Sequence, residues 1–218
     1  MIPFPQFEAV LKTRETEKII KLVNLFPGIL SETNQQGISG LLLIAYHQLP
    51  AVLEAVLPLK QPLTLYEALA CGQTKIVQEY MEKDASLLNQ PAPDGFPPLS
   101  LACYFGHEDL AIYLIDLGAD VNAVATNGTN IQALHAAVAR NNVVLCKLLL
   151  EKGAAVNAKQ TQGVTALHSA VRRGNLELVK LLVAFQADIS AQMDNGDTAI
   201  FIAEREKHPA ISAFLNGG

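Results

Sequence analysis

Hydrophobic and polar positions in the second half of the chain recur with the period of an amphipathic helix. One apolar stripe, spaced i, i+3, i+4 and i+7, comprises Leu178, Leu181, Leu182 and Phe185. The segment 144–150 repeats this spacing with Leu145, Leu148 and Leu149. Each stripe predicts a helix with one buried face, and we expect its leucines to lie in the core.

A first, shorter helix is predicted before each of these second helices. The two helices of a unit are separated by a residue type that tolerates left-handed backbone: Gly72, Gly106, Asn141 and Gly174. Thr165 and Thr198 stand where first helices begin, and a hydroxyl there can accept an orphan backbone N–H. Tight turns are predicted at Asp94-Gly95, Asn127-Gly128, Gln162-Gly163 and Asn195-Gly196.

This arrangement repeats along the chain, with the clearest copies 33 to 35 residues apart. The position that His168 occupies is filled in successive units by Phe7, Leu42, Tyr66, Ser100, His135, His168 and Phe201. The step from Leu42 to Tyr66 is only 24 residues, which predicts that the second unit lacks most of its connecting hairpin. The fifth unit carries an insertion, Asn130-Ile131, before its first helix.

Two motifs in the repeats resemble those of the ankyrin family, whose unit is a turn followed by two antiparallel helices. They are Thr165-Ala166-Leu167-His168 and Ala119-Asp120-Val121-Asn122-Ala123. The resemblance covers nearly the whole chain and is most specific between Gly95 and Ala191. It implies an all-α fold, an ankyrin-repeat solenoid of about seven helix-turn-helix units with degenerate outer units.

We expect residues 1–218 to form a single ankyrin-repeat domain. Its units are expected at about 4–33, 34–62, 63–93, 94–126, 127–161, 162–194 and 195–216. Charged residues at both ends suit polar caps on the array, as a repeat protein needs. On this basis the chain is expected to be a complete protein.

Composition narrows the class of protein. Half of the residues are hydrophobic and 17% are charged, so the chain can bury a substantial core. The net charge of −5 argues against nucleic acid as a partner. The apolar run Gly40–Leu59 could suggest a membrane span, but Pro50 interrupts it and Glu54 would lie in lipid without a partner. Two short buried helices explain the same residues, and we expect no membrane association.

The cysteines and the N-terminus indicate a reducing compartment. Cys71, Cys103 and Cys146 have no spacing typical of a zinc site, and small buried thiols explain them. The first residues lack the basic and apolar regions of a signal peptide. We therefore expect a cytoplasmic protein, and a monomer.

The sequence shows no constellation of catalytic residues. His135 and His168 hold the same position in neighbouring units, but stacked helices lie about 8–10 Å apart, too far for two ligands on one zinc ion. In the ankyrin family this histidine is structural, and its hydrogen bonds cross the turn. We expect no catalytic residues, no cofactor and no metal.

The resemblance implies a protein partner, bound on the concave face formed by hairpin tips and first helices. Two positions just before the glycine between the helices are expected to face it, and they include Tyr104, Phe105, Arg140, Arg172, Arg173 and Arg205. Arginine and aromatic residues are enriched at binding hot spots, and an arginine stripe suits an acidic segment. The alternative is that these cations merely complement helix dipoles in solvent. Secondary candidates at or near hairpin tips are Phe96, Asn130, Val164 and Met193.

The sequence thus predicts a non-catalytic scaffold for protein–protein interaction. Two alternatives stay open. One is a dedicated regulatory or inhibitory subunit of a single enzyme. The other is an enzyme with an unrecognised site, which would need a deep pocket with converging titratable groups.

Overall fold

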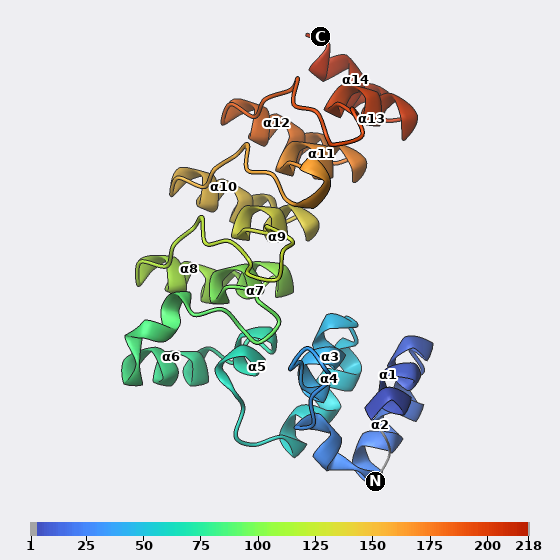
Figure 1. The fold of residues 1–218 in the computed structure, drawn as a ribbon, viewed down its shortest axis with the longest axis vertical. Coiled ribbons are helices and arrows are strands. Elements are labelled where there is room, and N and C mark those ends of the chain that lie inside the picture. Colours follow the sequence, from blue (N-terminus) through green and yellow to red (C-terminus); the bar gives the residue numbers. More distant parts are fainter. Residues whose placement is uncertain (1–3, 218) are drawn as a thin grey trace. The chain divides into compact units, whose positions relative to one another are not determined.

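Figure 1 shows the chain in a computed structural model, which describes residues 4–217. Within that range the regular structure is helical, with fourteen α-helices, four short 3-10 helices, two isolated β-bridges and no strand. The α-helices follow one another as seven pairs. The all-α repeat fold expected from the sequence is therefore confirmed.

Each pair consists of a first and a second helix. The first helices are α1 (Phe4–Thr13), α3 (Gly40–Tyr46), α5 (Leu65–Ala70), α7 (Pro98–Phe105), α9 (Ala133–Ala139), α11 (Ala166–Arg172) and α13 (Ala199–Arg205). The second helices are α2 (Thr16–Leu25), α4 (Pro50–Val56), α6 (Thr74–Lys83), α8 (Glu108–Asp116), α10 (Val143–Glu151), α12 (Leu176–Ala184) and α14 (Pro209–Leu215). The 3-10 helices are η1 (Pro27–Leu30), η2 (Leu57–Leu59), η3 (Ala85–Asn89) and η4 (Thr161–Gly163).

The helices group into two compact units. The first contains the residues up to Leu87 together with Ala92–Asp94, and the second contains Leu88–Pro91 and the residues from Gly95 onward. A single domain over residues 1–218 stays a prediction.

In the first unit the apolar run Gly40–Leu59 forms two short helices, α3 and α4, followed by η2. Ile44 on α3 and Val52 on α4 are fully buried. After η2 the chain runs through the cis peptide Gln61–Pro62 to α5, without a hairpin. The irregular step expected between the second and third repeats lies here.

The position expected for Tyr66 needs a correction. Thr64 caps α5, where its hydroxyl accepts a hydrogen bond from the backbone N–H of Glu67, the third residue of the helix. His168 holds that same position behind Thr165, so Glu67 and not Tyr66 is its counterpart. The side chain of Glu67 is buried, accepts a 2.6 Å hydrogen bond from the Ser39 hydroxyl, and forms a 3.3 Å ion pair with Lys60. Because the connection before α5 is shortened, aligning the repeats by sequence places this position one residue too early.

The second unit stacks its helices in two layers (Figure 1). The first helices α7, α9, α11 and α13 pack on one another in order, and α10, α12 and α14 do the same among the second helices. On α12 the fully buried residues are Leu178, Val179 and Leu182, whereas Leu181 is half-buried. Leu178 and Leu182 of the expected stripe are therefore confirmed as core residues, whereas Leu181 and Phe185 are half-buried and Val179 joins the core. The inner face of α12 contacts both its own first helix and the neighbouring second helices.

The first helices of the second unit all end in the same way. The residue that reverses the chain has positive φ in each of the four pairs: Gly106 (79°), Asn141 (54°), Gly174 (70°) and Lys207 (60°). The predicted left-handed positions are confirmed, and Lys207 adds one that the sequence did not suggest. This shared geometry presents the residues just before each reversal at equivalent places.

Candidate protein-binding surface

Two rows of side chains cross the second unit where its first helices end. We define the terminal row as the residues directly before the left-handed position: Phe105, Arg140, Arg173 and Glu206. The penultimate row lies one residue earlier: Tyr104, Ala139, Arg172 and Arg205. Because α7, α9, α11 and α13 pack in order, each row runs from repeat to repeat. The structure thus brings the four predicted arginines onto one surface, in two neighbouring rows.

Arg140 and Arg173 occupy the same terminal-row position in adjacent repeats. Both side chains are exposed, and neither guanidinium makes a hydrogen bond or ion pair with a described residue. Their backbones have nearly the same conformation, with φ/ψ of −98°/1° for Arg140 and −80°/−8° for Arg173. Two uncommitted cations therefore stand at equivalent backbone positions one repeat apart.

Arg205 is held by its own chain. Its guanidinium donates a 2.7 Å hydrogen bond to the carboxylate of Asp197 and contacts Glu206 at 3.3 Å. The guanidinium carbon also lies 5.6 Å from the centre of the Phe201 ring, within the range of a cation–π contact. The hydrogen bond to Asp197 raises the pKa of Arg205, and that same bond lowers the pKa of Asp197. Arg205 is thus less available to a partner than the sequence suggested.

Arg172 has an intermediate status. Its guanidinium lies 3.9 Å from the sulfur of Met193, a weak acceptor, and its charge contributes to the lowered pKa of Asp197. The side chain is exposed. Asp197 therefore lies within electrostatic reach of both penultimate-row arginines but hydrogen-bonds only to Arg205.

An aromatic pair begins the two rows. The rings of Tyr104 and Phe105 meet edge to face, with centroids 5.2 Å apart and an interplanar angle of 84°. Both side chains are half-buried. This geometry is typical of favourable aromatic contacts and leaves part of each ring accessible.

The four secondary candidates near the hairpin tips differ in how far the structure exposes them. Asn130 is exposed with a φ of 57°, and Phe96 is half-buried. Val164 and Met193 are only 7% and 8% exposed. A β-carbon on Gly163 would lie 3.2 Å from the Cα of Met193, so adjacent hairpins pack closely here. Contacts between hairpins, which the repeat pattern does not show, bury Val164 and Met193 and leave them poorly placed for a partner.

The two repeat histidines are structural, as expected. The Nδ1 atom of His168 accepts a hydrogen bond from the backbone N–H of Thr165 (3.1 Å), and its Nε2 atom is 3.0 Å from the carbonyl oxygen of Ala191. His135 makes the same bonds to Gln132 and Ala158. Burial lowers the pKa of both rings, although the carbonyl bond opposes this. Each neutral ring ties its first helix to the hairpin that follows.

Sequence reasoning missed a second set of links between repeats, made by asparagines. The Asn122 side chain accepts from the backbone N–H of Ala155 (2.8 Å) and donates to the carbonyl of Gly153 (3.1 Å). Asn157 repeats both bonds with Asp188 and Gln186. The recurrence of asparagine at this place in the Ala119–Ala123 motif was the available signal. These bonds fix the spacing between hairpins.

A shallow depression of about 390 Å³ lies on the hairpin side, lined by Asn157, Lys159, Asp188, Ser190, Ala191 and Gln192. The polar side chains of Asn157, Lys159, Asp188 and Ser190 are already engaged. The ammonium of Lys159 donates to the carbonyl of Gln192 (3.2 Å), and the carboxylate of Asp188 accepts from the backbone and hydroxyl of Ser190. Among the described residues, no group of three or more His, Cys, Asp or Glu side chains is arranged to hold a metal ion.

In residues 4–217, every helix is too short or too polar to cross a bilayer.

Comparison with known proteins defines the class. The family model of ankyrin repeats in three copies matches residues 65–160 and 134–217. These matches cover well over half of the chain and all of α7 to α14. The fold and the matches together identify a helical-repeat protein, and the chain belongs to the ankyrin-repeat family.

Individual relatives share only part of their length with this chain. Human ankyrin repeat and KH domain-containing protein 1 is 30% identical over 99 residues, which cover 44% of this chain and 4% of that protein. Human neurogenic locus notch homolog protein 2 is 38% identical over 90 residues, 41% of this chain and 4% of the relative. Human transient receptor potential cation channel subfamily A member 1 is 43% identical over 65 residues, 30% of this chain and 6% of the channel subunit. The shared feature is the repeat itself, a module for protein–protein interaction.

Proposed function

We propose that this chain is a non-catalytic scaffold that binds a protein partner through the terminal and penultimate rows of its second unit. The observation that carries the proposal is the pair Arg140 and Arg173, two exposed guanidiniums without partners at the same place in adjacent repeats. A guanidinium fork binds carboxylates in bidentate fashion, so the partner offers an acidic segment.

The neighbouring side chains support this assignment. Arg172 adds a third exposed cation, and the Tyr104–Phe105 pair adds partly accessible aromatic surface at one end. Aromatic residues and arginine contribute most of the energy in many interfaces, whereas exposed charge alone contributes little. A mixed aromatic and cationic surface therefore suits binding better than a purely solvated row of helix ends would.

We further propose that the protein is cytoplasmic and monomeric. The three cysteines support a reducing compartment, because each is a free thiol and two of them are buried in the second unit.

The test is capture of the partner from native cytosol, followed by affinity measurements at low and high salt. Arg140→Ala combined with Arg173→Ala should weaken binding and reduce its salt dependence. Each arginine at the rim would contribute about 0.2–1 kcal/mol, and one fully desolvated in the complex about 2 kcal/mol. Thermal stability should hardly change, since both side chains are exposed.

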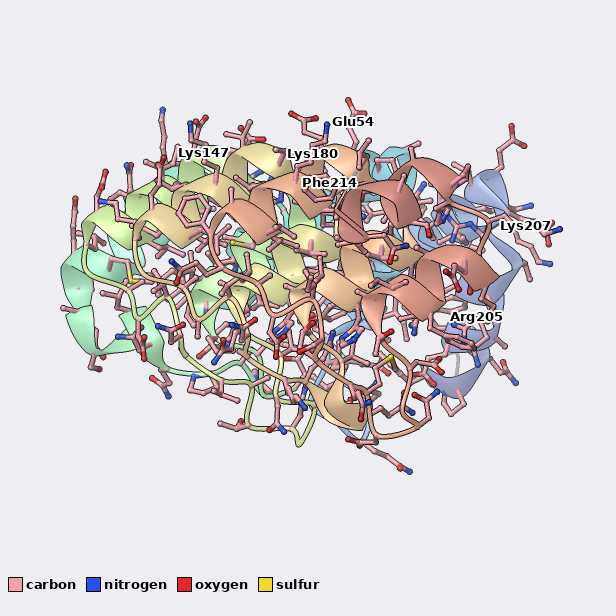
Figure 2. The ribbon with its side chains drawn as sticks, turned by 90° about the horizontal axis from the view of Figure 1, so that it is seen from above. Glu54, Lys147, Lys180, Arg205, Lys207 and Phe214 are labelled. Carbon is pink, nitrogen blue, oxygen red and sulfur yellow. The ribbon has the colours of Figure 1, made fainter. Side chains whose placement is uncertain are left out.

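Lys147→Ala combined with Lys180→Ala is the matched control. It removes the same charge from the second helices α10 and α12, and Figure 2 shows these lysines along the upper edge of the view, away from Arg205 at the right. Loss of binding in the control but not in the arginine variant would contradict the proposed surface. Recovery of a single enzyme in stoichiometric amount would make the chain a dedicated regulatory subunit.

A further inference from the structure

The terminal row has a regular spacing that selects the conformation of what binds there. Phe105, Arg140, Arg173 and Glu206 each precede a left-handed residue at the end of a first helix. Those helices pack directly on one another. Helices in contact lie about 8–10 Å apart, so equivalent side chains recur at about that interval.

A polyproline II segment matches this interval. It has three residues per turn and rises about 3.1 Å per residue, so every third side chain returns to the same face after about 9.3 Å. A β-strand does not fit as well, because its side chains alternate and residues three apart point to opposite faces. An α-helix of the partner would advance about 5.4 Å in one turn and about 10.8 Å in two, so its side chains would fall short of this interval or beyond it.

The chemistry of the row then specifies the side chains in order. Phe105, backed by the ring of Tyr104, offers an apolar contact. Arg140 and Arg173 each offer an uncommitted guanidinium to a carboxylate. Glu206 is exposed and its carboxylate pairs with Arg205 at 3.3 Å, so an acidic residue in the fourth place would meet a carboxylate instead of an uncommitted guanidinium.

We propose that the second unit recognises a polyproline II segment carrying an apolar residue and two acidic residues at intervals of three. The apolar residue lies at the Phe105 end, and the acidic residues lie at Arg140 and Arg173. This deepens the function proposed above and rests on it. It specifies the conformation of the bound segment and the spacing of its side chains along the row. The presence of exposed arginines alone specifies neither.

The experiment compares synthetic peptides with fixed composition and different order. Both Leu-Pro-Pro-Glu-Pro-Pro-Glu and its reverse place the apolar residue at one end, and each fits one chain direction. The control Glu-Pro-Pro-Leu-Pro-Pro-Glu has the same residues with the apolar one in the middle. Each peptide carries the same fluorophore, and its binding to the 218-residue chain is measured by anisotropy.

One of the two end-anchored peptides should bind at least tenfold more tightly than the control. Adding a third Glu at the next interval of three, opposite Glu206, should weaken that binding by a few-fold. Moving one Glu by a single residue should reduce the affinity to that of the control. Equal affinity for all of these peptides, or no measurable binding by any, overturns the proposal.

Charge exchange gives a second, independent readout. Arg140→Glu combined with Arg173→Glu should lose the end-anchored acidic peptide and bind the same peptide with Lys in place of Glu. Thermal melting and circular dichroism of this variant should match the wild type, because both residues are exposed.

The two proposals fail in different ways. If the alanine variant of Arg140 and Arg173 loses the captured partner but peptide order has no effect, the register rule is wrong and the binding surface stands. If that variant keeps the partner with full affinity, the proposed function itself is wrong.

Discussion

The carboxylate of Asp197 lies 2.7 Å from the guanidinium of Arg205, and the two residues come from the stem of a hairpin and the end of α13. The pair occupies the surface on which the guanidiniums of Arg140 and Arg173 stand without partners among the described residues. Asp197 also lies within the field of Arg172. It therefore competes, within the chain, for the groups that would bind an acidic partner.

Replacing this carboxylate should strengthen binding. Asp197→Asn removes the negative charge that binds the Arg205 guanidinium and partly neutralises the field of Arg172. The side-chain volume stays nearly constant. We expect the affinity for an acidic partner to rise roughly two- to fivefold, on the scale of one exposed ion pair. Glu204→Gln, which removes an exposed acidic charge with no ion pair to Arg205, is the control. Unchanged or weaker binding in Asp197→Asn would show that Arg172 and Arg205 do not contact the partner.

The same pair makes a prediction about acid stability. Its hydrogen bond to Arg205 lowers the pKa of Asp197 in the folded state relative to the unfolded chain. The contribution of the Asp197 carboxylate to the free energy of unfolding is therefore fully present above the usual pKa range of aspartate. It is lost as the pH falls through the lowered pKa of the folded state. The stability difference between wild type and Asp197→Asn should be constant from pH 7 to 5 and shrink at more acidic pH. Thermal melting across this range measures it.

The corrected core of α12 gives a second stability test. Leu182 is fully buried and Leu181 is half-buried. Leu182→Ala should cost about 2–5 kcal/mol of unfolding free energy, and Leu181→Ala distinctly less. Urea denaturation at 25 °C compares the two. A larger loss for Leu181→Ala would show that Leu181 and not Leu182 faces the core.

The histidine links predict how stability depends on pH near neutrality. Burial is the main reason that the pKa of His168 is lowered in the fold. A lowered pKa in the folded state means that the unfolded chain binds more protons than the folded chain at intermediate pH. The contribution of His168 to the free energy of unfolding is therefore fully present above the ordinary histidine pKa, about 6.5. It decreases as the pH falls from about 6.5 toward the lowered pKa of the folded state.

His168→Gln should make this decline shallower. At pH 7.5 it should also cost about 1–3 kcal/mol, because one amide cannot replace both the bond from Thr165 and that to Ala191. Unfolding free energies at pH 7.5 and 5.5 test this. An unchanged pH dependence would place the titrating group elsewhere.

The cysteines should differ in accessibility rather than in acidity. Desolvation raises the pKa of Cys71 and of Cys146 to about 12, and that of Cys103 further still. Since the thiolate is the reactive form, all three should react slowly at pH 8. Cys71 is only half-buried and should be modified first, whereas Cys103 and Cys146 require opening of the second unit. Time-resolved labelling with mass spectrometry separates these rates, and equal rates would contradict the assigned burial.

The sequence by itself determined the repeat, because the signals that build one unit are local. A threonine before a helix, a histidine three residues later and a left-handed residue after it act through bonds between near neighbours, as at Thr165, His168 and Gly174. The second helices were equally readable, since their apolar stripes follow from helical geometry alone. The arginine positions followed from this register, since Arg140, Arg172, Arg173 and Arg205 each stand one or two residues before a left-handed residue.

Only the tertiary structure decided which of those residues are available. Hairpin packing buries Val164 and Met193, Asp197 engages Arg205, and stacking selects Leu182 over Leu181 for the core. The short connection before α5 moved Glu67 into the place expected for Tyr66. Each of these outcomes depends on a neighbouring repeat or on a distant part of the same unit. A periodic pattern predicts which face of a helix a residue occupies. Which residues it contacts there is decided by packing between repeats, and the sequence of a single repeat does not contain that information.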